Sequence, residues 1–326
     1  AGLGPVFGPI LGALYGPIAL LWVVIGCVFA GAVHDYFSGM LSVRYNGKSV
    51  PDIVGYNLGD LIKKLMRVFA VVLLILVGVV FVAGPAGLLS QLTGMHSMLF
   101  VAIIFAYYFL ATILPVDKII GRVYPFFAVL LVFMAVGLLG ALAFKGYTFY
   151  SNIEWTMHSP SGLPAWPLVF ITIACGACSG FHATQSPLMA RCINNEKHGR
   201  KIFYGAMIAE GVIGLIWVTL GMSFYSDTAA LAAALGPKGN AALVVNNISV
   251  ELLGVFGGAL AVLGVVVLPV TSGDTAFRAA RLTIADAIGY DQRPHKNRLM
   301  IAVPLFVVGV ALNFIPFGML WRYFGF

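Results

Sequence analysis

Charged residues are scarce in this sequence. Asp, Glu, Lys and Arg make up 10% of its 326 residues, whereas 60% of them are hydrophobic. Soluble domains carry about 25% charged residues, so this composition excludes an ordinary soluble domain and indicates a protein of the lipid bilayer. The net charge of +7 is expected to report membrane topology rather than nucleic-acid binding.

Cysteine is also rare, and several chemical motifs are absent. The four cysteines lie in apolar or membrane-edge stretches, which excludes a disulfide framework. Cys175 and Cys178 have C-x-x-C spacing, but without a second pair they are a weak sign of metal or redox chemistry. The sequence lacks G-x-x-x-x-G-K-[ST], G-x-S-x-G and H-E-x-x-H. These absences disfavour an ATP-driven pump and a membrane hydrolase, so we expect no enzyme, no cofactor and no bound metal.

Long hydrophobic runs occupy most of the chain. A membrane-spanning helix needs about 20 apolar residues, and eight runs of that kind follow the opening stretch. The fold expected is therefore an all-α polytopic membrane protein with about eight full transmembrane helices. The predicted spans are 18–43, 68–90, 98–116, 123–144, 166–190, 202–225, 250–277 and 299–320.

Basic residues alternate between the predicted loops. Sixteen of the 19 Lys and Arg residues fall in every second loop or at its edge, and the other three are Lys145, Lys238 and Arg322. Cytoplasmic loops carry the excess of Lys and Arg. The basic loops are therefore predicted to be cytoplasmic, and residues 18–43 would run from outside to inside.

Two parts of the chain share an order of elements. Span 18–43 is followed by a cytoplasmic segment at 50–67 that reads as a short amphipathic helix. Span 202–225 is followed by an outside segment at 226–249 that is also partly helical. Two chance insertions would give the same pattern. A repeat entered from opposite sides of the membrane is typical of secondary transporters, and it predicts a first repeat at 1–145 and a second at 166–326.

Helix breakers stand at the start of both predicted repeats. The opening stretch AGLGPVFGPILGALYGP holds three Gly-Pro pairs, and ACGACSGFHATQSPLMAR at 174–191 holds Gly176, Ser179-Gly180 and Ser186-Pro187. Broken helices leave peptide groups unpaired, which is tolerated where they line a cavity. The spacing of Gly8, Gly12 and Gly16 also suits close helix packing. The prolines favour a discontinuous helix at the start of each repeat.

Four stretches resemble one protein family. FGPILGALYG (7–16), FAGAVHDYFSGMLSVRYNGKSVPDIVG (29–55), the stretch from ACGACSGFHATQSPLMAR to GLIW (174–217) and VLPVTSGDTAFRAARLTIAD (267–286) are similar to the carbon starvation protein A family. The resemblance implies a bacterial inner-membrane carrier of peptides or pyruvate within the amino acid–polyamine–organocation superfamily. It also implies an inverted repeat with helices one and six broken. Family members usually have apolar sequence upstream, so the chain is expected to start within broken helix one.

A substrate site is predicted at the two broken helices. Half-helix N-termini favour anionic groups, so a substrate carboxylate is expected near Gly4–Gly8 and Gly176–Gly180. His182, which titrates near neutral pH, is expected to edge the cavity in a polar run, although a lone His is often a packing residue. The substrate-binding candidates are Gly4, Pro5, Gly8, Gly176, Ser179, Gly180, His182, Thr184 and Gln185.

Acidic residues inside spans are the candidates for ion coupling, since a charge at the bilayer centre is expensive. Glu210 is expected to face the bundle interior, as a proton carrier or as a structural partner. Asp35 is read as a gate or relay and His34 as an interfacial anchor. Asp274 either couples a proton or pairs with Arg278 four residues on. The latter, like Arg281, is a candidate gate partner for Asp35 or a lipid anchor.

A cation site is implied by the resemblance alone. In sodium-coupled relatives, hydroxyls of helix eight and carbonyls of helix one hold Na⁺, which implies that Thr271 and Ser272 take comparable places. We therefore expect a secondary importer of a pyruvate-like acid or a peptide that works by alternating access and is coupled to H⁺ or Na⁺. A channel for small ions or anions is the alternative. The expected partners are a carboxylate or peptide substrate and membrane lipid, nucleic acid is not expected, and the sequence leaves the oligomeric state open.

Overall fold

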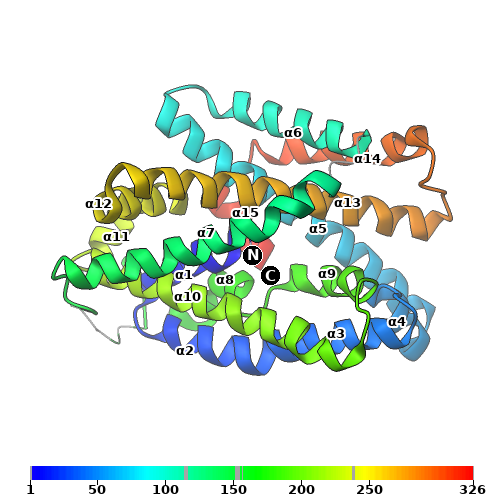
Figure 1. The fold of residues 1–326 in the computed structure, drawn as a ribbon, viewed down its shortest axis with the longest axis horizontal. Coiled ribbons are helices and arrows are strands. Elements are labelled where there is room, and N and C mark those ends of the chain that lie inside the picture. Colours follow the sequence, from blue (N-terminus) through cyan, green and yellow to red (C-terminus); the bar gives the residue numbers. More distant parts are fainter. Residues whose placement is uncertain (1, 114–116, 151–154, 156, 237–238, 326) are drawn as a thin grey trace.

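Every regular element in the computed structural model of the chain is a helix, and most helices run along the long axis of the molecule (Figure 1). The structure describes residues 2–113, 117–150, 155, 157–236 and 239–325. The first half contains α1 (Gly4–Gly12), η1 (Ala13–Tyr15), α2 (Ile18–Ile25), η2 (Gly26–Gly31), α3 (Ala32–Arg44), α4 (Val50–Leu58), α5 (Asp60–Thr93), α6 (Ser97–Ile113) and α7 (Asp117–Phe144). The second half contains α8 (Ala165–Ala177), α9 (Gly180–Ala190), η3 (Glu196–His198), η4 (Arg200–Tyr204), α10 (Gly205–Phe224), α11 (Thr228–Leu235), α12 (Ala241–Val262), η5 (Leu263–Val267), α13 (Leu268–Ile288), α14 (His295–Leu312) and α15 (Phe317–Gly325).

Seven segments of the described chain are long and apolar enough to cross a membrane. Helix α6 is apolar but has 17 residues, and the last three residues of the span predicted at 98–116 lie outside the described residues. The prediction of an all-α, multi-pass membrane protein is confirmed. The seven are Ile18–Arg44, Asp60–Thr93, Pro125–Phe144, Ala165–Ala190, Glu196–Phe224, Ala241–Ile288 and His295–Leu312.

Large apolar side chains cover much of the outer surface. Phe29 is 74% exposed and Val307 64% exposed, and both lie on predicted spans. A soluble protein rarely exposes apolar side chains in such numbers. Such a surface is stable in contact with lipid tails, which agrees with the seven segments that are able to cross a membrane.

Three predicted boundaries are wrong. The amphipathic helix predicted at 50–67 ends at Leu58, and residues from Asp60 onward belong to α5. The span predicted at 250–277 crosses a sharp kink at Gly254, whose φ is 64° and ψ −150°. The chain folds back at this kink and brings position 257 against position 249: a Cβ on Gly257 would overlap the carbonyl oxygen of Ser249. The span predicted at 299–320 ends at Leu312, before a turn and α15.

The two halves follow the same order after their kinks are taken into account. In the first half, the short helix α4 precedes the long helix α5. In the second half, the short helix α11 precedes two helical segments that meet at the Gly254 kink, and the second of them, residues 255–288, is as long as α5. Helices α4 and α11 lie at opposite ends of the molecule (Figure 1). The predicted division at 1–145 and 166–326 remains a prediction, and this order agrees with it.

Contacts between the halves are reciprocal. Helix α5 packs along α13, where Gly78 lies against the ring of Phe277 and Gly273 lies against Phe81. Helix α1 packs on α10 as α9 packs on α3. Such exchange of equivalent surfaces is the contact pattern that a two-fold relation produces.

Candidate functional site

A break in the backbone separates α8 from α9. Ser179 has φ 37° and ψ 81°, and the N–H groups of Cys178 and Ser179 both donate to the carbonyl of Ala174. A residue in the left-handed conformation cannot continue a right-handed helix, so the helical backbone is interrupted at Ser179. The interruption predicted within 174–187 is confirmed at this point. The predicted break at Ser186-Pro187 is wrong, since α9 continues through Pro187.

The opening stretch forms one short helix that ends in a turn. Pro5 stands at the start of α1, where a missing N–H costs nothing. Pro9 lies inside α1, and the chain leaves the helix at Gly16, which has φ 74° and ψ −154°. Gly4-Pro5 begins a helix and Gly8-Pro9 is carried within it, so residues 4–15 form one short helix and the break predicted inside this stretch is wrong. Gly16-Pro17 is instead the turn between that helix and α2.

Helix α1 lies directly against α8. Gly4 and Gly8 are buried, and a Cβ on Gly4 would clash with Cys175 while one on Gly8 would lie 3.1 Å from the carbonyl oxygen of Thr172. A Cβ on Gly176 would lie 3.1 Å from the Gly4 carbonyl oxygen. Gly4, Pro5, Gly8 and Gly176 therefore serve close helix packing, and none of them lines the cavity beside α9.

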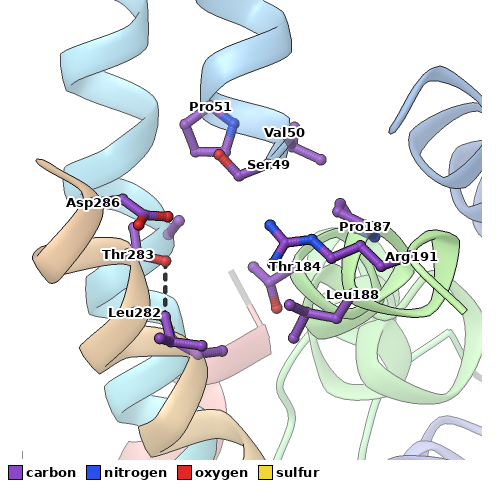
Figure 2. A pocket seen from close by; sticks show the side chains of 12 residues that line it. Ser49, Val50, Pro51, Thr184, Pro187, Leu188, Arg191, Leu282, Thr283 and Asp286 are labelled. Carbon is purple, nitrogen blue, oxygen red and sulfur yellow. Dashed lines mark hydrogen bonds between the residues drawn. The ribbon is translucent and has the colours of Figure 1, made fainter. Parts of the chain in front are cut away.

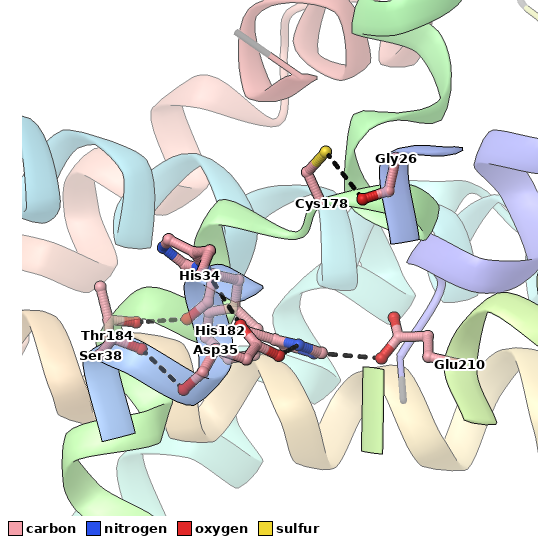
Figure 3. A network of polar contacts seen from close by, with 9 residues as sticks. Gly26, His34, Asp35, Ser38, Cys178, His182, Thr184 and Glu210 are labelled. Atoms are coloured by element: carbon pink, nitrogen blue, oxygen red, sulfur yellow. Dashed lines mark hydrogen bonds and ion pairs between the residues drawn. The ribbon is translucent and has the colours of Figure 1, made fainter. Parts of the chain in front are cut away.

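Three side chains meet beside the break between α8 and α9. His182 is on the first turn of α9, Asp35 on the first turn of α3, and Glu210 on α10. Nδ1 of His182 lies 2.7 Å from Oδ2 of Asp35, and Nε2 lies 3.1 Å from Oε2 of Glu210 (Figure 3). The imidazole of this triad thus bridges two carboxylates that come from opposite halves of the chain.

Burial makes this triad a costly arrangement. The side chains of Asp35, Glu210 and His182 are 4%, 6% and 20% exposed. An imidazole donates from both nitrogens only when it is protonated, so an imidazolium satisfies both carboxylates at once. A buried charge needs such partners. The prediction that Glu210 faces the bundle interior is confirmed, and sequence reasoning did not pair it with His182.

His34 extends the triad toward a cavity. Its Nδ1 lies 3.1 Å from Oδ1 of Asp35, and the Ser38 hydroxyl donates to the Asp35 carbonyl at 3.2 Å. His34 lines the cavity and its side chain is 40% exposed. The sequence favours an interfacial anchor at this position, and the structure places His34 beside the site instead.

The α9 cavity, with a volume of about 310 Å³, lies beside the N-terminus of α9. Apolar side chains of α5 and α9, such as Phe69, Leu73 and Phe181, form much of its wall. Gly180 and Thr184 are the substrate-binding candidates that line it. Ser179 is buried behind it, and the Gln185 amide donates to the Thr184 hydroxyl at 3.1 Å.

A second, smaller cavity continues from the first toward α4. It measures about 100 Å³ and shares Val50, Pro51 and Thr184 with its larger neighbour. Figure 2 shows Arg191 on one wall and Asp286 on the other. The two cavities are therefore neighbours, one lined by His34 and the other by Arg191 and Asp286.

A third cavity of about 410 Å³ lies near the opposite end. Its lining includes Ser90, Gln91 and Asn240 together with Phe7 of α1. Phe181, which lines the α9 cavity, packs edge-on against Phe81, which lines neither cavity, and Gly84 and Phe7 pack together at the wall of the third cavity. Buried aromatic rings thus separate a cavity at one end from a cavity at the other.

Side-chain hydrogen bonds join η2 to the end of α8 and to η4. A π-helical turn leaves carbonyl groups without their usual donors. The Cys178 thiol donates to the Gly26 carbonyl at 3.9 Å, and the Tyr204 hydroxyl donates to the Val28 carbonyl at 3.2 Å. The Cys27 thiol donates to the carbonyl of Gly176 at 3.5 Å. Sequence reasoning missed these contacts, and the small residues Gly26, Ala30 and Gly31 are the only signal for them.

The candidates on α13 lie in a different setting. The Thr271 hydroxyl donates to the Leu268 carbonyl at 2.8 Å, and Asp274 forms an ion pair with Arg278 at 2.6 Å. This intrahelical pair is the structural alternative that the spacing of the two residues predicts. Ser272 is half-buried on the same helix.

The predicted gate between Asp35 and the arginines of α13 is wrong in this structure. Asp35 contacts His182 and His34, whereas Arg278 contacts Asp274. Arg281 is buried and lines a different cavity, at the end of α13. The two sets of charges therefore belong to separate sites.

The thiols make no metal cluster. All four cysteines are free, and the described part of the chain has no group of three His, Cys, Asp or Glu side chains that would hold a metal ion. Cys175 lines the α9 cavity, and Cys178 bonds to the Gly26 carbonyl. Nothing in this geometry gives the C-x-x-C spacing a chemical role.

Comparison with known proteins shows a family to which the chain is similar and several relatives. Residues 1–84 and 85–253 match the family model described as carbon starvation protein CstA. The chain is 48% identical over 288 residues to a Haemophilus influenzae protein named "Uncharacterized membrane protein", covering 72% of this chain and 78% of that protein.

Some relatives have functional names, and two of them illustrate the range. The chain is 26% identical over 287 residues to the "Peptide transporter CstA" of Campylobacter jejuni, and 26% identical over 286 residues to the "Pyruvate/proton symporter BtsT" of Escherichia coli. Each match covers 66% of this chain. The chain spans 40% and 39% of the length of these two proteins.

Proposed function

Because the chain belongs to the carbon starvation protein CstA family, we propose that it forms a secondary transporter of the bacterial inner membrane. It imports a small organic acid or a peptide by alternating access, and a proton gradient drives the import. The names of the peptide and pyruvate/proton transporters among its relatives support this class of substrate and this ion.

The observation that carries the proposal is the bridge of Asp35, His182 and Glu210. With the imidazole protonated, the triad holds one net negative charge, and one further proton neutralises it. The three residues come from α3, α9 and α10, so a change in that charge alters the attraction between three helices. A buried titratable cluster that joins helices of both halves is a suitable proton carrier for a transporter.

The α9 cavity suits a small acid or a short peptide. Its volume of about 310 Å³ is at the lower end of small-ligand pockets, which run from about 300 to 1,000 Å³. The start of α9 borders it and favours an anionic group. His34 adds a second group that is able to meet a carboxylate, while Phe69 and Leu73 supply an apolar wall.

Two features support alternating access. The α9 cavity and the cavity beside Asn240 lie on either side of the aromatic contacts of Phe81. The reciprocal packing of α5 on α13 supports the inverted repeat of 1–145 and 166–326. Rocking one half against the other around such a layer is the motion that inverted repeats permit.

A proton is the coupling ion that the geometry favours over Na⁺. Asp274 is paired with Arg278, and the Thr271 hydroxyl is turned to the carbonyl of Leu268. Neither group is offered to a cation in this arrangement. A sodium site at Thr271, Ser272 and Asp274 remains the alternative, and it requires the Asp274–Arg278 pair to open.

Uptake into proteoliposomes tests the proposal. The full-length protein is reconstituted, and uptake of labelled pyruvate and of a labelled dipeptide is measured under separate H⁺ and Na⁺ gradients. Concentrative uptake is expected under the H⁺ gradient alone. Glu210→Gln is expected to abolish concentrative uptake of the substrate but to leave substrate exchange intact, because the neutral amide can no longer bind and release a proton.

Control variants separate coupling from other effects. Glu251→Gln changes an exposed acid and is expected to transport like the wild type. Asp274→Asn tests the sodium alternative and is expected to retain proton-driven uptake. Uptake that follows only the Na⁺ gradient, or a conductance without concentration as a channel would give, would contradict the proposal.

A further inference from the structure

A large basic cavity lies apart from the triad, where the end of α6, the end of α13 and the start of α14 meet. Its volume is about 740 Å³. Four arginines and one histidine line it, against a single acid, Asp291, among the described residues. The basic side chains are those of Arg278, Arg281, Arg293, His295 and Arg298.

The two acids near this cavity contact residues that line it. Asp274 is engaged by Arg278, and Asp291 accepts a hydrogen bond from the backbone N–H of Arg293. Arg298 is fixed at the rim because its Nε donates to the Gln292 carbonyl at 2.7 Å. An anion placed in this space would be attracted by the guanidinium groups of Arg281, Arg293 and Arg298.

Arg281 brings a charge deep into the protein. The residue is 8% exposed, yet it lines the cavity. Guanidinium groups are the donors best shaped for the oxygens of phosphate and carboxylate groups. A guanidinium at the base of a basic cavity, with others at its rim, is the arrangement of an anion site.

Two further features of the cavity point to a ligand. Both polar atoms of the Gln292 side chain are buried, and neither has a hydrogen-bond partner among the described residues. Buried amides are nearly always paired. In addition, α14 begins at His295 without a capping side chain, so the positive end of this 18-residue helix borders the cavity.

We propose that this cavity binds a phosphate group, held by Arg281, Arg293, Arg298 and the Gln292 amide. The same chemistry is presented by the headgroup of an anionic phospholipid and by free inorganic phosphate. The apolar side chains Leu110 of α6 and Met300 of α14 are exposed close in sequence to the lining residues, which favours a lipid headgroup. Basic pockets between membrane helices on the cytoplasmic side bind such headgroups.

Thermal unfolding of the purified protein tests the site without reference to transport. Protein in a neutral detergent is titrated with phosphatidylglycerol, with phosphatidylcholine, or with inorganic phosphate at constant ionic strength. Phosphatidylglycerol is expected to raise the midpoint temperature in a saturable way, and phosphatidylcholine is not. Saturation by inorganic phosphate alone would assign the site to a soluble anion and overturn the preference for lipid.

Charge-matched variants complete the test. Arg281→Gln/Arg298→Gln is expected to weaken phosphatidylglycerol binding at least about tenfold, since it removes two charge-assisted donors. Lys197→Gln/Arg200→Gln removes two exposed charges from another basic loop and is expected to bind as the wild type does. Gln292→Leu keeps every charge and is expected to weaken binding several-fold, which provides the test if the double variant does not fold.

Three outcomes would overturn the site. The first is equal binding by the wild type and by whichever of these variants folds. The second is equal weakening by the Lys197→Gln/Arg200→Gln control, which would mean that net charge alone attracts the lipid. The third is an absence of saturable binding by the wild type to either phosphate source.

Discussion

Asp35 and His182 are separated by 147 positions in the chain, yet their side chains are 2.7 Å apart. Asp35 lies on the first turn of α3, and His182 lies on the first turn of α9, just after the left-handed residue Ser179. The contact therefore depends on the break between α8 and α9, because an unbroken helix would carry His182 elsewhere. Both the triad and the tight backbone packing around it are open to measurement.

Removal of the imidazole is expected to destabilise the protein strongly. His182→Ala removes the imidazole that bridges two buried carboxylates and leaves His34 as the remaining imidazole beside Asp35. Breaking a buried ion pair costs about 3–5 kcal/mol. Reversible unfolding in mixed micelles measures the difference. His198→Ala, an exposed histidine of η3, is the control and is expected to lie within about 0.5 kcal/mol of the wild type. A His182→Ala protein as stable as that control would refute the bridge.

The close approach of η2 to the end of α8 is expected to exclude any side chain at position 31. A Cβ on Gly31 would overlap the Ala177 carbonyl oxygen, which is backbone and has little freedom to move. Gly31→Ala is expected to cost about 1–3 kcal/mol as overpacking. Gly140→Ala, with nothing within 4 Å of the added atom, is expected to be neutral or stabilising by up to about 1 kcal/mol. Equal unfolding midpoints for the two variants would show that the approach is looser.

The break after α1 is expected to require glycine. Gly16 has φ 74° and ψ −154°, a region that other residues reach only with about 1–3 kcal/mol of strain. Gly94 also has a positive φ, of 73°, but with ψ 0° it lies in the ordinary left-handed region. Gly16→Asn is therefore expected to unfold at a lower temperature than Gly94→Asn, since Asn tolerates only the second conformation. The reverse order would mean that the chain does not need this backbone conformation at Gly16.

Acid is expected to weaken the contact between α4 and α5. Burial alone would raise the pKa of Asp52, but its hydrogen bonds with Lys63 and Ser49 and the charge of Arg67 hold the pKa below its ordinary value of 3.8. A lowered pKa means that folding favours the ionised form. The stabilisation is thus complete above about pH 4 and is lost as the pH falls through the folded-state pKa.

Asp52→Asn provides the measurement for this contact. The variant is expected to lose about 1 kcal/mol at neutral pH, and the difference from the wild type is expected to shrink below about pH 4. Asp60→Asn, at the exposed start of α5, is the control and is expected to change the stability at neutral pH less than Asp52→Asn does. A wild-type advantage that persisted unchanged at pH 3 would contradict the role of the ionised carboxylate.

Sequence reasoning predicts the helices and the candidate residues, but not which of those residues contact one another. Composition and hydropathy predict spans because lipid demands long apolar helices, and Gly-Pro and Ser-Gly pairs mark the breaks at Gly16 and Ser179. Glu210, Asp35 and His182 stand out because charged or titratable groups are expensive inside spans. Their meeting at one point depends on the crossing of three helices, which local patterns do not encode.

Other features are hidden for definite reasons. Gly254 lies in an apolar run that reads as one span, and only its backbone conformation shows that the chain turns back there. The Gly-Pro pairs at Gly4 and Gly8 read as ligand-binding breaks, whereas α1 uses these small residues to lie against α8. The basic cavity gathers residues from α13, α14 and their connection, so its charges appear in the sequence only as part of a topology signal.

The shared imidazole has a thermodynamic corollary. His182 contacts acids on two helices at once, so a movement of α9 away from α3 or α10 is expected to change the proton affinity of this cluster. Linkage is reciprocal, so gaining or losing a proton must bias the tilt of α9 by the same free energy. Under the proposed function, α9 would couple occupancy of the cavity on one side to protonation of this cluster on the other, and the backbone break at Ser179 would be the point about which it tilts.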